Sequence, residues 1–187
     1  LDTAVAESLK EFADALEGTP EEDFAAAARM AREAVTAVRG KACRASEKTF
    51  FCGCADYRMT QASNADPEAK AFPEYMGARF GAKFAVCSKD PDEKEIADLV
   101  KCADGAENII FSSCNAHLFR GQLALAAALA EKGVPMTVAA LRNPYDLPLM
   151  PENAALLAAF DYSRDSLAAL ADVFSGGDCC GVMPAAL

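Results

Sequence analysis

The sequence predicts an α/β protein, a three-layer α/β/α sandwich with a mostly parallel, flavodoxin-like sheet that follows a helical lead-in. The first observation behind this prediction is an alternation of short apolar runs with helically spaced segments of about 10 to 15 residues. The second is that the short runs are apolar along their length, as in strands that helices cover on both faces. Strands joined by such helices lie parallel, with right-handed crossovers.

The helical lead-in comes first. Residues 2–17 carry apolar side chains at helical spacing on an acidic segment. A Thr-Pro-Glu-Glu start at residues 19–22 combines an N-cap, a proline at the first helical position and a capping box. It predicts a second helix that runs to about Val38 and stops before Gly40. The predicted domains are the lead-in, residues 1–40, and the sandwich, residues 41–187.

The sandwich elements follow from the same alternation. Strands are expected at residues 49–55, 83–87, 109–114, 134–141 and 154–160. Helices are expected at residues 67–80, 92–102, 120–132 and 164–174. Glycines follow most of these helices, as is usual after a helix C-terminus.

Composition excludes two broad classes of partner. A formal net charge of -10 opposes the phosphate attraction that non-specific nucleic-acid binding requires. No apolar run reaches the ~18 residues that predict a membrane span. A hydrophobic fraction of 52% with 25% charged residues is typical of a packed domain.

The eight cysteines are predicted to be reduced thiols. Several lie in predicted core strands, and a chain of this length needs no disulfides. Cys52 and Cys54 alternate onto one strand face, where a thiol acts as a small hydrophobic group. Cys179 and Cys180 lie in a glycine-rich tail and are either an intermolecular bridge or a reduced pair. Reduced thiols favour a cytoplasmic location.

Cofactors and metals are not expected. A zinc site needs a second pair of ligands at suitable spacing, and the sequence has only one histidine and no C-x-x-C motif. The first strand is followed by Asp-Tyr-Arg rather than by the Ser/Thr/Gly-rich loop that a flavin phosphate prefers.

Polar residues follow the predicted strands at their carboxyl ends, where open parallel sheets bind ligands. The candidates for contact with a ligand or another domain are Asn115, His117, Arg142, Asn143, Tyr145, Asp146, Asp161 and Tyr162. Each also has a purely structural interpretation. Asn143 and Pro144 simply end a strand in that view, and Tyr145 and Asp146 cap the following turn. His117 is then a turn histidine, and neither it nor Cys114 is predicted to be catalytic.

The same region carries a family resemblance. Asn115-Ala116 follows one strand, Gly121-Gln122 opens the next helix, and Arg-Asn-Pro-Tyr-Asp at residues 142–146 follows the next strand. An aromatic-rich turn at residues 159–163 and a Ser-x-x-Ala-Leu helix at residues 166–170 come after them. In this order they resemble the C-terminal α/β sandwich domain of glycoside hydrolase family 3, especially its bacterial β-N-acetylhexosaminidase branch.

The resemblance covers most of the chain from about Ala28 onward and is strongest from Asn115 to Leu170. Two segments depart from the family pattern, residues 41–46 and residues 183–185.

The resemblance implies a noncatalytic domain. The family hydrolyses β-linked sugars on a preceding (β/α)8 barrel, which alone needs ~250 residues and cannot fit here. In the hexosaminidase branch the acid/base group also belongs to a barrel loop, and its motif is absent from this sequence. We therefore expect this chain to be inactive alone, to support a separate barrel and to border its sugar site. Carbohydrate and a second copy of the chain are the further candidate partners.

One alternative stays open. In it, the chain is a stand-alone flavodoxin-like module that binds a small ligand or self-associates through residues 1–38.

The assignment of reduced cysteines makes a direct prediction. Titration of the denatured, unreduced protein with a thiol reagent should find close to eight free thiols. Four or fewer would contradict the assignment and would indicate an oxidising compartment.

Overall fold

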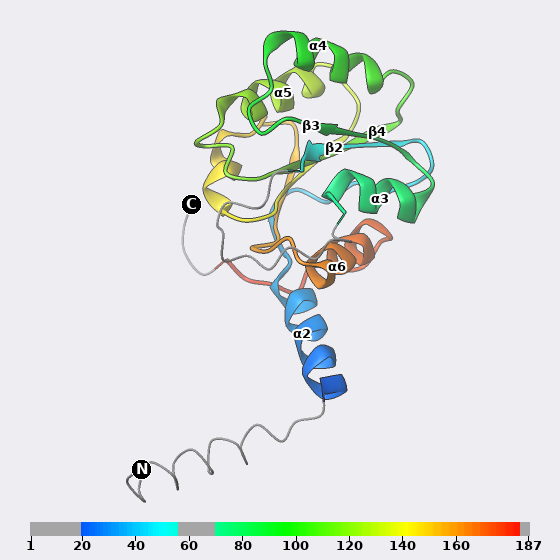
Figure 1. The fold of residues 1–187 in the computed structure, drawn as a ribbon, viewed down its shortest axis with the longest axis vertical. Coiled ribbons are helices and arrows are strands. Elements are labelled where there is room, and N and C mark those ends of the chain that lie inside the picture. Colours follow the sequence, from blue (N-terminus) through cyan, green and yellow to red (C-terminus); the bar gives the residue numbers. More distant parts are fainter. Residues whose placement is uncertain (1–19, 56–69, 184–187) are drawn as a thin grey trace, which may run out of the picture.

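A computed structural model describes residues 20–55 and 70–183 (Figure 1). In chain order the elements are α2 (Pro20–Ala34), β1 (Thr36–Arg39), β2 (Thr49–Cys54), α3 (Phe72–Phe80), β3 (Lys83–Cys87), α4 (Glu93–Cys102), β4 (Asn108–Ser113), α5 (Arg120–Ala130), β5 (Met136–Ala140), the 3-10 helix η1 (Pro144–Leu149), β6 (Ala155–Ala158) and α6 (Arg164–Phe174).

The strands form one six-stranded sheet in the order β1-β6-β5-β4-β2-β3. Strands β2 to β6 run parallel. The edge strand β1 is antiparallel to its neighbour β6. Helices α3 and α6 cover one face and α4 and α5 cover the other, while α2 extends away from the body (Figure 1). The predicted three-layer sandwich with a mostly parallel sheet and a helical lead-in is confirmed.

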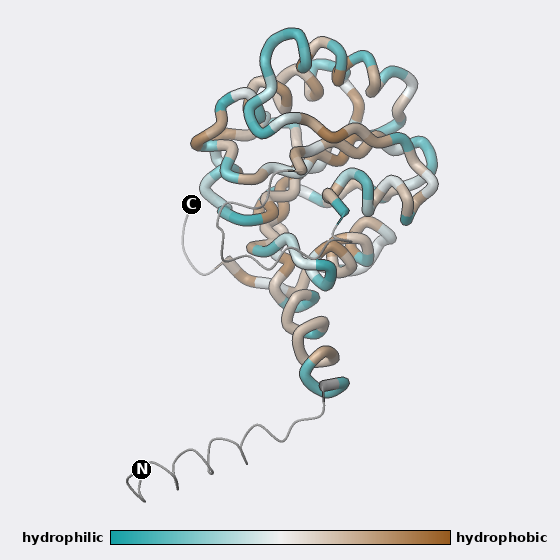
Figure 2. The backbone as a smooth tube through the Cα atoms, viewed as in Figure 1, coloured by the Kyte–Doolittle hydropathy of each residue, from teal (hydrophilic) through white to brown (hydrophobic). Residues whose placement is uncertain are grey.

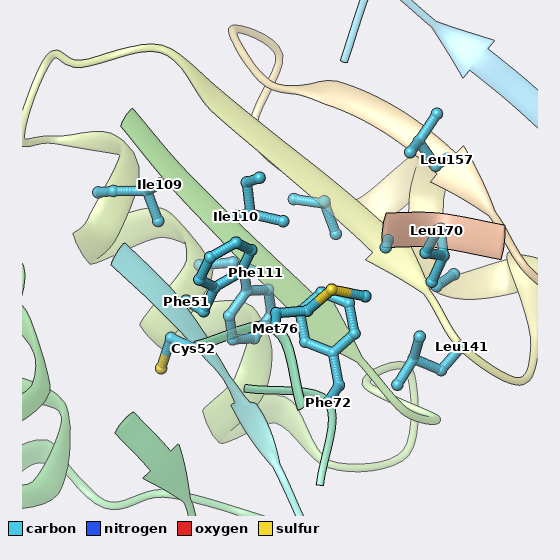
Figure 3. Close-up of a cluster of buried hydrophobic side chains, with 14 of the residues drawn as sticks. Phe51, Cys52, Phe72, Met76, Ile109, Ile110, Phe111, Leu141, Leu157 and Leu170 are labelled. Carbon is cyan, nitrogen blue, oxygen red and sulfur yellow. The ribbon is translucent and has the colours of Figure 1, made fainter. Parts of the chain in front are cut away.

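The core is apolar on both faces of the sheet. Every residue of the inner strands β2 and β5 is buried, which explains their uninterrupted apolar sequences. On the α3–α6 face, Phe51 lies 6.2 Å from Phe72 and 5.7 Å from Phe80, measured between ring centroids. Hydrophobic residues accordingly concentrate along the strands (Figure 2). Figure 3 shows Phe51 of β2 and Phe111 of β4 in one buried cluster with Phe72 of α3.

The end of the second helix was predicted wrongly. The helix begins at Pro20 as expected but ends at Ala34, and residues up to Arg39 form β1 instead. Thr36 pairs with Ala158 of β6, so the strand depends on a partner more than a hundred residues away. Four residues after an alanine-rich helix still fit helical spacing, and local periodicity alone cannot detect this pairing. The domain division near residue 40 stays a prediction, and the helix expected at residues 2–17 lies outside the described residues.

Apart from shifts of one or two residues at other element ends, two further features differ from expectation. Helix α3 begins at Phe72, where the Glu74 side chain accepts a hydrogen bond from the Ala71 backbone N–H, rather than at residue 67. Residues 67–69 lie outside the described part of the chain. The turn after β5 is a 3-10 helix, η1, which the strand-and-helix alternation did not indicate.

All eight cysteines are free thiols. Cys52, Cys54, Cys87 and Cys114 are buried, in line with their predicted role as small hydrophobic groups. A hydrogen bond with Cys52, together with burial, raises the pKa of Cys87 far above its ordinary value. The Cys87 thiol is therefore a poor nucleophile. Within residues 20–55 and 70–183, no helix is both long and apolar enough to cross a membrane.

Candidate functional site

The candidate site lies at the carboxyl edge of the sheet, where β4 and β5 end side by side. The two strands are parallel, and Ser113 is the register partner of Ala140. The segments that leave them, residues 114–119 and 141–149, therefore start next to each other, although they are distant in sequence. Six of the eight candidate residues come from these two segments: Asn115, His117, Arg142, Asn143, Tyr145 and Asp146.

Asn115 makes the tight turn that follows β4. Its φ angle is 55°, in the left-handed region that asparagine tolerates better than most residues. Its carbonyl oxygen accepts hydrogen bonds from the backbone N–H groups of Leu118 at 2.9 Å and Phe119 at 3.2 Å. This turn places His117 above the end of the sheet.

The Gly-Gln pair anchors this turn to two strands. The buried side chain of Gln122 accepts a hydrogen bond from the Cys114 N–H at 3.0 Å and donates to the Cys114 carbonyl at 3.1 Å. It also donates to the Lys89 carbonyl at 2.9 Å, in the loop after β3. Gly121 is needed for this approach, because an added Cβ would lie 2.3 Å from the Pro91 carbonyl oxygen. The link from Gln122 to Lys89 spans 33 positions, so local spacing does not predict it.

His117 and Asp146 join the two segments. The Nδ1 atom of His117 lies 2.7 Å from Oδ1 of Asp146, and the His117 backbone N–H donates to the same oxygen at 2.9 Å. The Asp146 side chain has no exposed surface, whereas 26% of the His117 side chain is exposed. The buried aspartate therefore lies on the interior side of the histidine and sets the orientation of the imidazole ring.

These hydrogen bonds determine which hydrogen-bonding group the imidazole exposes to solvent. A carboxylate that accepts from Nδ1 selects the Nδ1–H tautomer and leaves Nε2 as a hydrogen-bond acceptor. Nε2 has no hydrogen-bond partner among the residues that the structure describes. A buried carboxylate is costly unless donors surround it, so the two bonds from His117 stabilise Asp146 as well.

The second segment presents an exposed aromatic ring. Asn143 caps η1 by accepting a hydrogen bond from the Tyr145 N–H at 3.2 Å, which agrees with the predicted turn role of this motif. Tyr145 is 64% exposed, and its ring lies edge-to-face with the His117 imidazole, 6.5 Å away between centroids. Arg142 is half-buried at the start of the segment, and its Nη1 atom has no partner in the described part of the chain.

Asp161 and Tyr162 follow β6, which is the neighbour of β5 in the sheet. Burial raises the pKa of Asp161, but hydrogen bonds from the Ser163 side chain, the Tyr162 backbone and the Ser166 side chain hold it below its ordinary value. The Ser166 hydroxyl donates to Asp161 Oδ2 at 3.0 Å. Asp161 thus helps to fix the start of α6.

The arrangement has a limited chemical repertoire. The residues described form no cluster of three or more metal ligands. Cys114 is buried, which disfavours a thiol nucleophile beside His117. What remains is an oriented histidine beside an exposed tyrosine, a pairing suited to binding.

A pocket of about 600 Å³ lies elsewhere, between β1 and the end of α6. Its lining includes Lys41, Arg44 and Gly176. Arg44 is already bound to the protein, since its Nε and Nη2 atoms donate to the Ser175 carbonyl. We give this pocket less weight than the strand exits, because its main cation is engaged in closing α6.

No protein-family model matches the sequence, and no curated protein matches it. Several solved structures match the fold. The chain is similar to a glycoside hydrolase family 3 β-N-acetylglucosaminidase from Paenibacillus sp., with a TM-score of 0.72 and 23% identity over 84% of this chain and 31% of the other. The chain has the fold of part of a family 3 glycoside hydrolase. The predicted family resemblance is thereby confirmed at the level of the fold.

Two further family 3 structures agree. A β-glucosidase from Listeria innocua, solved with isofagomine, matches with a TM-score of 0.64 and 12% identity over 84% of this chain and 26% of that one. A fungal multi-domain β-N-acetylglucosaminidase matches with a TM-score of 0.61 and 17% identity over 80% of this chain and 17% of that one. This chain therefore spans about a third or less of the proteins that share its fold.

The link between His117 and Asp146 can be tested by stability. Asp146→Ala leaves two donors of His117 unpaired and should lower the free energy of unfolding by about 1–3 kcal/mol in urea denaturation. Asp146→Asn keeps an acceptor oxygen and should cost less. The exposed neighbour Tyr145→Ala should stay within about 0.5 kcal/mol of the wild type. Equal stability of Asp146→Ala and Tyr145→Ala would contradict the assigned role.

Proposed function

We propose that this chain is the noncatalytic C-terminal sandwich domain of a family 3 glycoside hydrolase of the β-N-acetylhexosaminidase type. In this proposal it supports a (β/α)8 catalytic barrel supplied by other residues or another subunit. The observation that carries the proposal is the fold similarity to the Paenibacillus β-N-acetylglucosaminidase, which extends over 84% of this chain but only 31% of that enzyme.

The carboxylates at the strand exits support a noncatalytic role. Retaining glycoside hydrolysis needs two carboxyl groups ~5 Å apart, one of them a nucleophile open to the sugar. Asp146 has no exposed surface and accepts two hydrogen bonds from His117. Asp161 accepts a hydrogen bond from Ser166 at the start of α6. Asp146 is closed to solvent, and Asp161, although exposed, is engaged in holding the start of α6.

Self-association remains the second candidate, and one observation favours it. Helix α2 presents Phe24, 72% exposed, and Met30, 69% exposed, as it leaves the body (Figure 1). Exposed apolar side chains on a projecting helix are typical of a surface that meets a partner. A second copy and a catalytic barrel are both suitable partners for this helix.

The proposal predicts that the purified chain lacks hydrolase activity. It should release no nitrophenol from 4-nitrophenyl N-acetyl-β-D-glucosaminide above the buffer background. An antibody against the chain should nevertheless deplete this activity from an extract of the source cells, together with a polypeptide or subunit large enough to contain a barrel.

Two outcomes would contradict the proposal. The first is turnover by the purified chain that is lost in His117→Ala. The second is depletion of the chain with no loss of activity beyond that caused by a non-immune antibody. Sedimentation of the purified chain as a stable dimer, combined with that second outcome, would favour the self-association module.

A further inference from the structure

The two edges of the sheet differ in how they are protected. At one edge, β1 has a register shift between Ala37 and Arg39, and Gly181 of the C-terminal tail donates a hydrogen bond to the neighbouring Val35 carbonyl at 2.9 Å. Bulges and covering segments are two of the features that keep an edge strand from pairing with another chain. At the other edge, β3 follows β2 in unbroken register over its whole length. Among the described residues, no strand pairs with the outer side of β3.

Strand β3 also exposes apolar side chains. Phe84 is 47% exposed and Val86 is 37% exposed, and the two share one face of the sheet because they are two positions apart. The Phe84 ring is held against Gly77 of α3, where an added Cβ would lie 2.3 Å from Phe84 Cδ1. Unpaired backbone N–H and C=O groups beside exposed apolar side chains favour the addition of another strand.

The sequence of β3 is complementary to itself when two copies run antiparallel. Ala85 is the central residue of the strand, so a two-fold axis at Ala85 sets Phe84 of each copy opposite Val86 of the other. Aromatic and β-branched side chains that lie directly opposite each other are favourable cross-strand pairs. A two-fold contact of this kind closes as a dimer and does not continue into a filament.

The two ends of β3 carry opposite charges. Lys83 begins the strand and lies on the α4 face, since alternate side chains point to opposite faces. Glu95 of α4 lies at the other end, where its carboxylate accepts hydrogen bonds from the Ser88 N–H at 2.6 Å and the Ser88 hydroxyl at 2.5 Å. Antiparallel pairing brings Lys83 of each copy beside this carboxylate of the other. Parallel pairing in the same register would place like charges together, so charge selects the antiparallel arrangement.

We propose that β3 is an interface for a second copy of this chain, and that two copies pair antiparallel about Ala85, which joins two six-stranded sheets into one. This surface is separate from the exposed side chains of α2. Stable dimers bury about 1,200 Å² or more, and two strands of five residues supply less. We therefore expect a weak dimer, with a dissociation constant of about 0.1 mM.

Sedimentation equilibrium of the full chain, from about 10 µM to about 1 mM, tests the interface. The wild type should change from monomer to dimer over this range in about 0.15 M salt, which screens the repulsion between two copies of net charge -10. Val86→Glu places two carboxylates on the pairing surface and should raise the dissociation constant about tenfold or more. Val86→Thr keeps the β-branched shape and should raise it less than about threefold.

Exchange of the charges separates pairing from folding. Lys83→Glu and Glu95→Lys should each weaken the dimer about fivefold, because each sets like charges beside one another across the two-fold axis. The double variant restores opposite charges and should return to within about twofold of the wild type. Damage to the fold would instead accumulate in the double variant. Phe24→Ala, on α2, should leave the dissociation constant unchanged.

Amide hydrogen exchange locates the contact, since β3 amides should become more protected as the protein concentration rises. A monomer at about 1 mM would overturn the interface, as would a dimer that Val86→Glu leaves intact or that Phe24→Ala abolishes. Protection of β3 that is equal at all concentrations would also overturn it and would assign this edge to another segment of the chain. None of these results bears on the proposed function, which depends on hydrolase activity and its depletion.

Discussion

The burial of one carboxylate constrains the functional edge of this fold. Asp146 has no exposed surface, yet a charged group in that position is tolerated only when donors surround it. His117 supplies two donors to Oδ1, one from its backbone and one from its ring, across 29 positions of sequence. The other oxygen, Oδ2, is buried and has no hydrogen-bond partner among the described residues. The conformation of the turn after β4 and the start of η1 are thus set together. The direction of the imidazole and the position of Tyr145 follow from this one interaction.

The parallel sheet makes that interaction possible. Register between Ser113 and Ala140 brings two exits to the same edge, and Gln122 ties the first of them to the loop after β3. Gly121 permits the close approach of that loop, since any side chain there would meet the Pro91 carbonyl. The Gly-Gln and Arg-Asn-Pro-Tyr-Asp motifs therefore have a physical explanation. They are the residues with which adjoining strand exits of this fold hold one another.

Most of the strands and helices could be predicted from the sequence, because their apolar patterns are local. Uniform apolar runs predicted the inner strands, and helical spacing followed by glycines predicted α6 at its observed bounds, Arg164–Phe174. Strand β1 could not be predicted, since its four residues depend on pairing with β6. The contact between His117 and Asp146 was also missed, although both residues were candidates. No spacing rule connects two side chains that only the sheet register brings together.

This edge of the sheet has buried residues and exposed residues with two different roles. Asp146 and Gln122 are buried and hold the loops of this edge in place, whereas Tyr145 and part of His117 are exposed to solvent. Such an edge is suited to binding and lacks an exposed carboxylate nucleophile among these four residues. Under the proposed function, such an edge would complement a catalytic barrel supplied by other residues.

The central claim is that Asp146 fixes His117 with its Nε2 atom available to a ligand. Long-range ¹H–¹⁵N correlation of the imidazole, recorded where the ring is neutral, tests this directly. The structure predicts the Nδ1–H tautomer in the wild-type protein and its loss in Asp146→Ala. A dominant Nε2–H tautomer in the wild-type protein, the form that free histidine favours, would contradict the claim.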